Sequence, residues 1–548
     1  MQRRRFLTSL AATAAAAPAV GLLRPALATA PRPLPPADPT VELSDEALGW
    51  LAHLHRKVSL GGTWHKEDKV GPQWDTTSFA PTMQYARYEL TWLSWSMGLM
   101  AETTPAWREE YARILGFLGD RYLEYWSFWE WIEHRGDDPG RGEYPAALKG
   151  IIPEGWWGRY NLPGWAGNGS QGQPFDMDPI RAAGRYGLMY KGYLNLVLSM
   201  YGYVADDGKY ERPFTIRYDD AHQWRHTQRG LNRLLADQWR AHEEGIACEV
   251  AKVYPWCNAL SGAGVLLYDR LRGTRYSEAY FRWQRYYAKH FVGPAAATPE
   301  WLTGYYDPIN RIELRDDKNG NGGNWMPTAW HGLAADPALF EPLARGAMTR
   351  FYRGQPDGTG YFSLRGKADI DVNIVTGLGA AIAAELGDAE RHRAALAWIQ
   401  ARYEPRWDRD LGEFAFGFGL AEAWPRGQMN AWVMPALLVR YPGHWRRIFQ
   451  APNTAKFREP TLEGVDFPTL RIRRARFDGA RRTLEVATTT TSDSQRGRPT
   501  SLRVTRLAPG SRVTVVTDGG PGVELRAEAG SVTIPTTVDD HRIAVHVG

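Results

Sequence analysis

Residues 245–271 read GIACEVAKVYPWCNALSGAGVLLYDRL and show how the central part of the chain is built. Asn258 is a suitable capping residue, and the apolar stretch from Asn258 to Leu271 has helical length. Similar segments occur at Leu231–His242, Ile374–Leu386 and Ala389–Arg402. A series of this kind predicts a mainly α protein. Helical hairpins arranged as an (α/α)6 toroid fit the length and the pattern, and a right-handed superhelix of the same hairpins fits the pattern nearly as well.

The helical signals extend from Ser44 to about Tyr441, and we assign residues 44–452 to the toroid as the catalytic domain. Thr104-Pro105 and Asp178-Pro179 look like helix starts, with a capping residue before a proline. Residues 135–175 are rich in Gly, Pro and Trp, and a long segment without periodicity is typical of a functional loop.

The end of the chain has a different character. Residues 470–473 and 543–547 alternate between apolar and polar side chains, and Gly-containing turns separate such segments. We therefore predict a small antiparallel β-sandwich over residues 458–548. All 24 tryptophans lie between Trp50 and Trp445, so aromatic binding or chemistry belongs to the helical part.

The N-terminus resembles an export signal. Consecutive arginines at residues 3–5 precede an Ala-rich stretch that ends at Ala26-Leu27-Ala28, which is typical of a twin-arginine signal over residues 1–28. A Pro-rich linker follows over residues 29–43. We expect a periplasmic or secreted protein without stable membrane insertion; an uncleaved membrane anchor is the alternative. The leader holds four arginines and no acid, so its removal leaves +1 of the formal charge of +5, which gives no support for nucleic-acid binding.

The chain has only two cysteines, Cys248 and Cys257. They suit a disulfide in an oxidising compartment, two separate buried thiols, or a catalytic pair. Two cysteines alone cannot complete a four-ligand structural zinc site, and the sequence has no His/Glu metal motif, no Walker loop and no G-x-S-x-G. We therefore expect neither a metal nor a cofactor.

The cysteine region resembles a known family. Cys248-Glu249 and Cys257-Asn258, with eight residues between the cysteines and an apolar helix after them, resemble the linalool dehydratase-isomerase family. Residues 84–90 resemble its first core helix, and residues 188–194 with Tyr203 and Tyr210 resemble its central helix and the turn after it. The resemblance covers roughly residues 70–440. It implies an (α/α)6 toroid, often assembled as a homo-oligomer.

The resemblance also implies an activity. It suggests a lyase or isomerase that removes, adds or moves water on a terpene-type alcohol, with a small hydrophobic alcohol or alkene as its partner. Such chemistry needs a proton donor, a base and an aromatic pocket that stabilises an allylic cation. The residues expected to carry the catalytic chemistry are Cys248, Cys257, Tyr88, Glu249 and Asp75. Those expected to bind substrate are Met189, Tyr193, Tyr85, Trp256 and Tyr305.

The chain departs from the family at two of these positions. Tyr193 stands where the family carries a histidine, and a tyrosine donates hydrogen bonds but is a poor base near neutral pH. Asp75 is the nearest counterpart of the family's N-terminal aspartate, although its distance from Tyr88 is longer than the family pattern.

Other functions fit the composition. A glycoside hydrolase or polysaccharide lyase of the toroid type would need two carboxylates across a Trp-lined cleft, from Asp75, Glu130, Asp176 and Glu249. A non-catalytic binding protein is a third possibility. For His331, a lone histidine, we expect a satisfied core or surface position.

Overall fold

The computed structural model describes residues 33–59, 86–123, 178, 180–181, 187–217, 220–221, 223–248, 253–294, 299–308, 311–316, 324–363, 375–419 and 427–548. The helices in these ranges are α1 (Asp45–Ser59), α2 (Ala86–Thr103), α3 (Glu109–Tyr122), α6 (Leu188–Val204), α7 (Gln228–Ala241), α8 (Pro255–Arg272), α9 (Ser277–His290), α10 (Trp325–Ala335), α11 (Pro337–Phe351), α13 (Thr376–Glu385), α14 (Ala389–Arg402), α15 (Gly427–Val433), α16 (Pro435–Leu438) and α17 (His444–Gln450). Helices dominate this part of the chain, which confirms the prediction of a mainly α protein.

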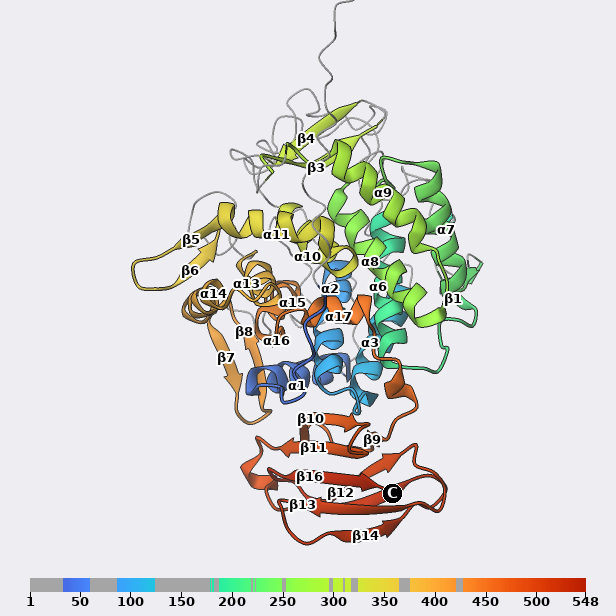
Figure 1. The fold of residues 1–548 in the computed structure, drawn as a ribbon, viewed down its shortest axis with the longest axis vertical. Helices are drawn as coiled ribbons and strands as arrows, with labels where there is room; N and C mark the ends of the chain where they lie inside the picture. The colour runs from blue at the N-terminus through green and yellow to red at the C-terminus, as the bar shows by residue number, and fades with distance from the viewer. Residues whose placement is uncertain are drawn as a thin grey trace, which may run out of the picture.

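Six of the described helices form a closed succession. Helices α2, α6, α8, α10, α13 and α15 contact one another in that order, and α15 returns to α2 (Figure 1). We call them the core helices. The helices that follow them in the chain pack against this set: α3 against α2 and α6, α7 against α6, α9 against α8, α11 against α10, and α14 against α13.

The neighbouring core helices α6 and α8 run in the same direction and pack closely. A Cβ on Gly192 of α6 would lie 1.8 Å from Ser261 Oγ of α8, and one on Gly264 of α8 would lie 2.9 Å from the Leu196 Cα of α6. Residue numbers rise together across these pairs, so α6 and α8 are parallel. Gly98 of α2 lies equally close to α6, since a Cβ built on it would be 3.0 Å from the Met200 sulfur. The N-terminal ends of α2, α6 and α8 therefore lie at one end of the succession.

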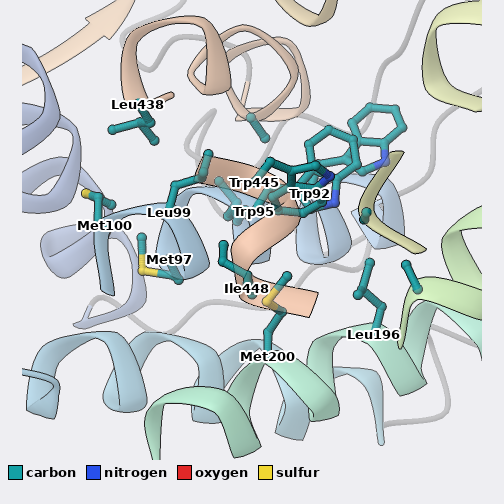
Figure 2. Packing of buried hydrophobic residues seen from close by; sticks show 14 of the residues in the cluster. Trp92, Trp95, Met97, Leu99, Met100, Leu196, Met200, Leu438, Trp445 and Ile448 are labelled. Carbon is teal, nitrogen blue, oxygen red and sulfur yellow. The ribbon is translucent and has the colours of Figure 1, made fainter. Parts of the chain in front are cut away.

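The opposite end is closed by the last helix and the C-terminal strands. Helix α17 contacts α2, α8, α10 and α13, and Figure 2 shows its Ile448 close to Met200 of α6. The C-terminal end of α2 meets β10, where Arg476 donates a 2.8 Å hydrogen bond to the Glu102 carbonyl. In Figure 1 the C-terminal strands lie at the bottom, beneath α1 and α3.

These strands form two antiparallel sheets. One sheet has the order β10-β11-β16-β13-β14 and the other has the order β15-β12-β9. Alternating side chains point inward, as Val513 and Val515 do in β13. The strands are β9 (Thr461–Glu463), β10 (Arg471–Asp478), β11 (Thr483–Thr489), β12 (Pro499–Thr505), β13 (Arg512–Thr517), β14 (Val523–Arg526), β15 (Val532–Thr537) and β16 (Arg542–Val547).

Two expectations about the helical part were wrong. Four β-hairpins interrupt it, because strands of three to six residues are too short to reveal themselves by alternation. They are β1 (Phe214–Arg217) with β2 (Gln223–His226), β3 (Leu302–Asp307) with β4 (Ile312–Asp316), β5 (Tyr352–Gly354) with β6 (Gly360–Phe362), and β7 (Pro405–Asp408) with β8 (Glu413–Phe416). Thr104 does not start α3, because its hydroxyl donates to the Met100 carbonyl at the end of α2 and α3 begins at Glu109.

None of the helices in the described ranges has both the length and the apolar character that crossing a bilayer requires.

The close approach of α6 and α8 predicts a difference between two glycines. Gly264→Ala would place a methyl group 2.9 Å from the Leu196 Cα, so we expect it to lower the free energy of unfolding by about 2 kcal/mol. Gly202→Ala in α6 has nothing nearer than 3.5 Å, so it should be neutral or stabilising by up to about 1 kcal/mol. Denaturant unfolding checks this, and equal effects of the two changes would contradict the packing described.

Candidate active site

The two cysteines lie together at the N-terminal end of α8. Cys257 is in the first turn of this helix, and Cys248 lies in the segment before it. The Sγ atoms are 2.8 Å apart, with the Cys248 thiol as donor, which is longer than the ~2.05 Å of a disulfide bond. Both side chains are buried. Of the arrangements left open by the sequence, the structure therefore has two sulfurs in contact without a disulfide bond.

Asn258 holds the two segments that carry these thiols. Its Oδ1 accepts hydrogen bonds from the Ile246 N–H at 3.0 Å and from the Trp239 indole at 2.9 Å. Its Nδ2 donates to the carbonyls of Ile246 and Tyr254, both at 3.0 Å. The side chain thus bonds to both backbone groups of Ile246, two residues before Cys248. Its role is to join this segment to α8, rather than only to cap the helix as the sequence suggested.

Helix α6 contributes a tyrosine that contacts Cys257. Tyr193 Oη lies 3.6 Å from Cys257 Sγ, within hydrogen-bonding distance for sulfur, and either atom can be the donor. Met189 lies one turn earlier on the same face of α6 and is buried. The close packing of α6 on α8 brings Tyr193 to the thiol.

Trp256, the residue before Cys257, belongs to a group of tryptophans from several core helices. Trp256 of α8 stacks on Trp92 of α2, with 6.3 Å between ring centroids, and meets Trp432 of α15 edge-on at 5.8 Å. Trp95 of α2 extends the group, with its ring 6.0 Å from that of Trp432. Figure 2 shows Trp92 and Trp95 beside Trp445. We call Trp92, Trp95, Trp256, Trp330, Trp432 and Trp445 the tryptophan cluster.

A comparison with protein families bears on this part of the chain. Residues 155–414 match the family model of linalool dehydratase/isomerase. This segment, just under half of the chain, is similar to the linalool dehydratase/isomerase family. The family implies a dehydratase or isomerase that acts on a small hydrophobic terpene, and it confirms the resemblance drawn from the cysteine region. The matched segment contains Met189, Tyr193, both cysteines and Tyr305.

Tyr305 lies beside the segment that leads into α8. Its ring is buried and stacks on Tyr254, the residue before α8, with 5.2 Å between centroids. The next residue, Tyr306, pairs with Val253 through two backbone hydrogen bonds of 2.8 and 2.9 Å. Tyr305 therefore supports the entry to α8.

Several residues predicted for the site lie outside the described part of the chain. They are Asp75, Tyr85 and Glu249, together with Glu130 and Asp176 of the alternative hypothesis. Tyr88 lies in the first turn of α2, but its side chain is outside what the structure describes. The site is therefore built from Cys248, Cys257, Tyr193, Met189 and Trp256.

Two residues of this region, Trp92 and Trp432, were not among the predicted site residues, and His331 was expected only in a satisfied core or surface position. Trp92 and Trp432 lie between Trp256 and the rest of the tryptophan cluster, and the only local signal was the spacing of Trp92 and Trp95 on one helix face. His331 of α10 contacts Trp95, with 5.1 Å between ring centroids. Burial lowers the pKa of His331 to about 3, so its imidazole is neutral at physiological pH.

The role of Asn258 predicts a change in thiol reactivity. Asn258→Ala removes four hydrogen bonds and frees the Ile246 segment, so we expect Cys248 and Cys257 to react with a small disulfide reagent at least tenfold faster. Asn430→Ala is the matched control, because Asn430 bonds in the same way to the N–H and carbonyl of Phe416. Both variants should lose stability. Equal labelling rates in the two variants would contradict the role of Asn258.

The buried imidazole predicts a pH effect on stability. The unfolded chain protonates His331 below about pH 6.5, whereas the folded protein does so only near pH 3. The free energy of unfolding therefore rises with pH across this window. In His331→Phe this contribution is lost, so the stability advantage of the wild type should shrink by about 1 kcal/mol per unit as the pH falls below 6.5. Urea unfolding at pH 4.5, 5.5 and 6.5 tests this, and parallel curves would contradict it.

Proposed function

We propose that this protein dehydrates, hydrates or isomerises an allylic or tertiary terpene-type alcohol, with Cys248 and Cys257 as its acid/base pair. The observation that carries the proposal is the contact of the two cysteine sulfurs with each other and of one with a tyrosine hydroxyl. The residue beside Cys257, Trp256, belongs to the tryptophan cluster. Groups that can donate and accept a proton, and an aromatic surface, are what this chemistry requires.

The first step is loss of the hydroxyl group. A thiol or the Tyr193 phenol donates a proton to the alcohol oxygen, and the C–O bond breaks with its electron pair on oxygen. The products are water and an allylic cation. Indole faces stabilise such a cation by cation–π attraction, by about 2 kcal/mol where water is excluded. We assign this role to Trp256, the residue before Cys257, and to Trp92, which stacks on it.

The second step removes a proton from carbon or returns water. In dehydration the group that gave up its proton takes one from the carbon next to the cation, which forms the alkene and regenerates the acid. In isomerisation water adds at the other end of the allylic system and its proton goes to the same base. The 2.8 Å separation of the two sulfurs lets a proton pass between them, so the acid and the base need not be the same thiol.

The arrangement around this site is part of the proposal. The closed succession of core helices supports an (α/α)6 toroid with the thiols at the N-terminal end of these helices. Assembly as a homo-oligomer follows from the family resemblance, and export as a folded protein follows from residues 1–28. The C-terminal sheets contact the opposite end of α2, so they are not expected to supply catalytic groups.

The hydrolase alternative has no comparable support. Its four candidate carboxylates, Asp75, Glu130, Asp176 and Glu249, all lie outside the described residues, and the family match favours a dehydratase or isomerase. A substrate screen with linalool, geraniol and aryl glycosides separates the two functions directly.

Single substitutions test the thiol mechanism. Under reducing conditions we expect Cys248→Ala and Cys257→Ala each to lower kcat/KM for linalool by 10²-fold or more, because each removes a proton-transfer group. Tyr193→Phe should lower kcat about tenfold with little change in KM.

Tyr190→Phe is the matched control for Tyr193→Phe, since the Tyr190 hydroxyl of the same helix donates to the Tyr122 carbonyl at 2.7 Å, away from the thiols. It should keep near-wild-type kcat. Wild-type activity in either cysteine variant, or a stable Cys248–Cys257 disulfide in active protein by non-reducing mass spectrometry, would overturn the mechanism.

A further inference from the structure

His331 presents an unused hydrogen-bond acceptor inside the protein. The side chain is fully buried in α10, and its Nδ1 lies 2.7 Å from the Pro327 carbonyl one turn earlier. A carbonyl only accepts, so the proton is on Nδ1 and Nε2 carries a lone pair. Within the described part of the chain Nε2 has no hydrogen-bond partner. A buried acceptor without a donor destabilises the fold by about 1–3 kcal/mol, so a donor is to be expected there.

Unused donors lie on the rings around it. Trp95 meets His331 edge-on at 5.1 Å, and Trp330 precedes His331 in α10 and lies 6.3 Å from Trp95, centroid to centroid. Both rings are fully buried, and within the described residues neither indole N–H has an acceptor. A lone pair and two N–H groups without partners thus occur in one set of touching rings.

We propose that His331, Trp95 and Trp330 form a hydroxyl-binding site at the inner part of the tryptophan cluster. The hydroxyl donates its hydrogen to His331 Nε2, and its oxygen accepts from an indole N–H. A carbonyl has no hydrogen to give to Nε2, and a cation has no lone pair to accept from an indole, so neither satisfies both kinds of group. An O–H group does, and it comes either from an alcohol or from an enclosed water molecule.

The site is continuous with the proposed reaction centre. Its alcohol form, which rests on the proposed function, holds the hydroxyl of linalool before that hydroxyl moves to the thiols, because one oxygen cannot be at both places. Trp95 contacts Trp432, Trp432 contacts Trp256, and Trp256 precedes Cys257 in α8. His331 is neutral at the working pH, since burial lowers its pKa to about 3, so it orients a hydroxyl without exchanging a proton with it. His331 is a positioning residue that favours ligands with a hydroxyl over hydrocarbons of the same skeleton.

Binding measurements test this site with and without the acceptor. Wild type, His331→Phe and His331→Gln are titrated at pH 7 with linalool and with the hydrocarbon that linalool yields on losing water. If the substrate supplies the hydroxyl, His331→Phe weakens linalool binding about tenfold and leaves hydrocarbon binding within about twofold. His331→Gln, whose amide oxygen replaces Nε2, keeps most of the affinity for linalool.

The enclosed-water form gives a different result. The two ligands then respond alike to His331→Phe, and a high-resolution crystal structure of the wild type shows a water oxygen within about 3.2 Å of Nε2 that is absent from the variant. Both results support a hydroxyl site and identify its source. The site is refuted if wild-type crystals, free and with linalool, show no oxygen within hydrogen-bonding distance of Nε2.

His444→Phe is the matched control. His444 is equally buried and stacks on Tyr441 at 4.4 Å, and burial likewise lowers its pKa to about 3. This variant should lose stability without altering the ratio of the two affinities, and the same change of ratio in both variants would refute a specific role for His331. Linalool bound at Nε2 without turnover contradicts the proposed function alone, whereas turnover with no oxygen near Nε2 contradicts the hydroxyl site alone.

Discussion

The close parallel packing of α6 on α8 is the constraint on which the site depends. Gly192 and Gly264 leave no room for a side chain at the two crossing points, so the helix backbones approach more closely than larger residues would allow. This approach puts the phenol of Tyr193 next to the sulfur of Cys257, one turn before Ser261. A wider separation would leave the thiol pair intact but would remove the phenol from it.

Because α2, α6 and α8 have their N-terminal ends together, the proposed chemistry lies at one end of these helices and the stabilising packing at the other. Their N-terminal ends carry the thiols and the first tryptophans. Their other end is filled by α17, whose Ile448 lies near Met200 of α6, and is fixed to the C-terminal sheets through α2. Packing at that end stabilises the helices without competing for the positions that chemistry needs. Changes in the sheets should therefore affect stability more than turnover.

The features that the sequence predicted correctly depend on residues close together in the chain, whereas those it did not predict depend on residues far apart. The bounds of α14 were predicted to the residue and those of α8 to within three, because helical periodicity and capping are local. The cysteine spacing identified the family for the same reason. The contact of Trp95 with Trp445 joins residues 350 positions apart, and His331, whose Nε2 has no partner within the described residues, packs on Trp95 of a different helix. No local pattern encodes such contacts, so His331 was assigned to a satisfied core or surface position.

Under the proposed mechanism, the surroundings of Cys257 favour thiols over carboxylates. The described partners of its sulfur are a thiol and a phenol, and burying a carboxylate beside them would require removing a full charge from water without a partner. A neutral thiol behaves in such a place as a small apolar group. When it protonates the alcohol, the thiolate and the allylic cation arise together, so the site goes from neutral to an ion pair rather than from one uncompensated charge to another. An apolar interior tolerates two opposite charges in contact far better than one alone, and this favours acid/base groups that are uncharged until the substrate reacts.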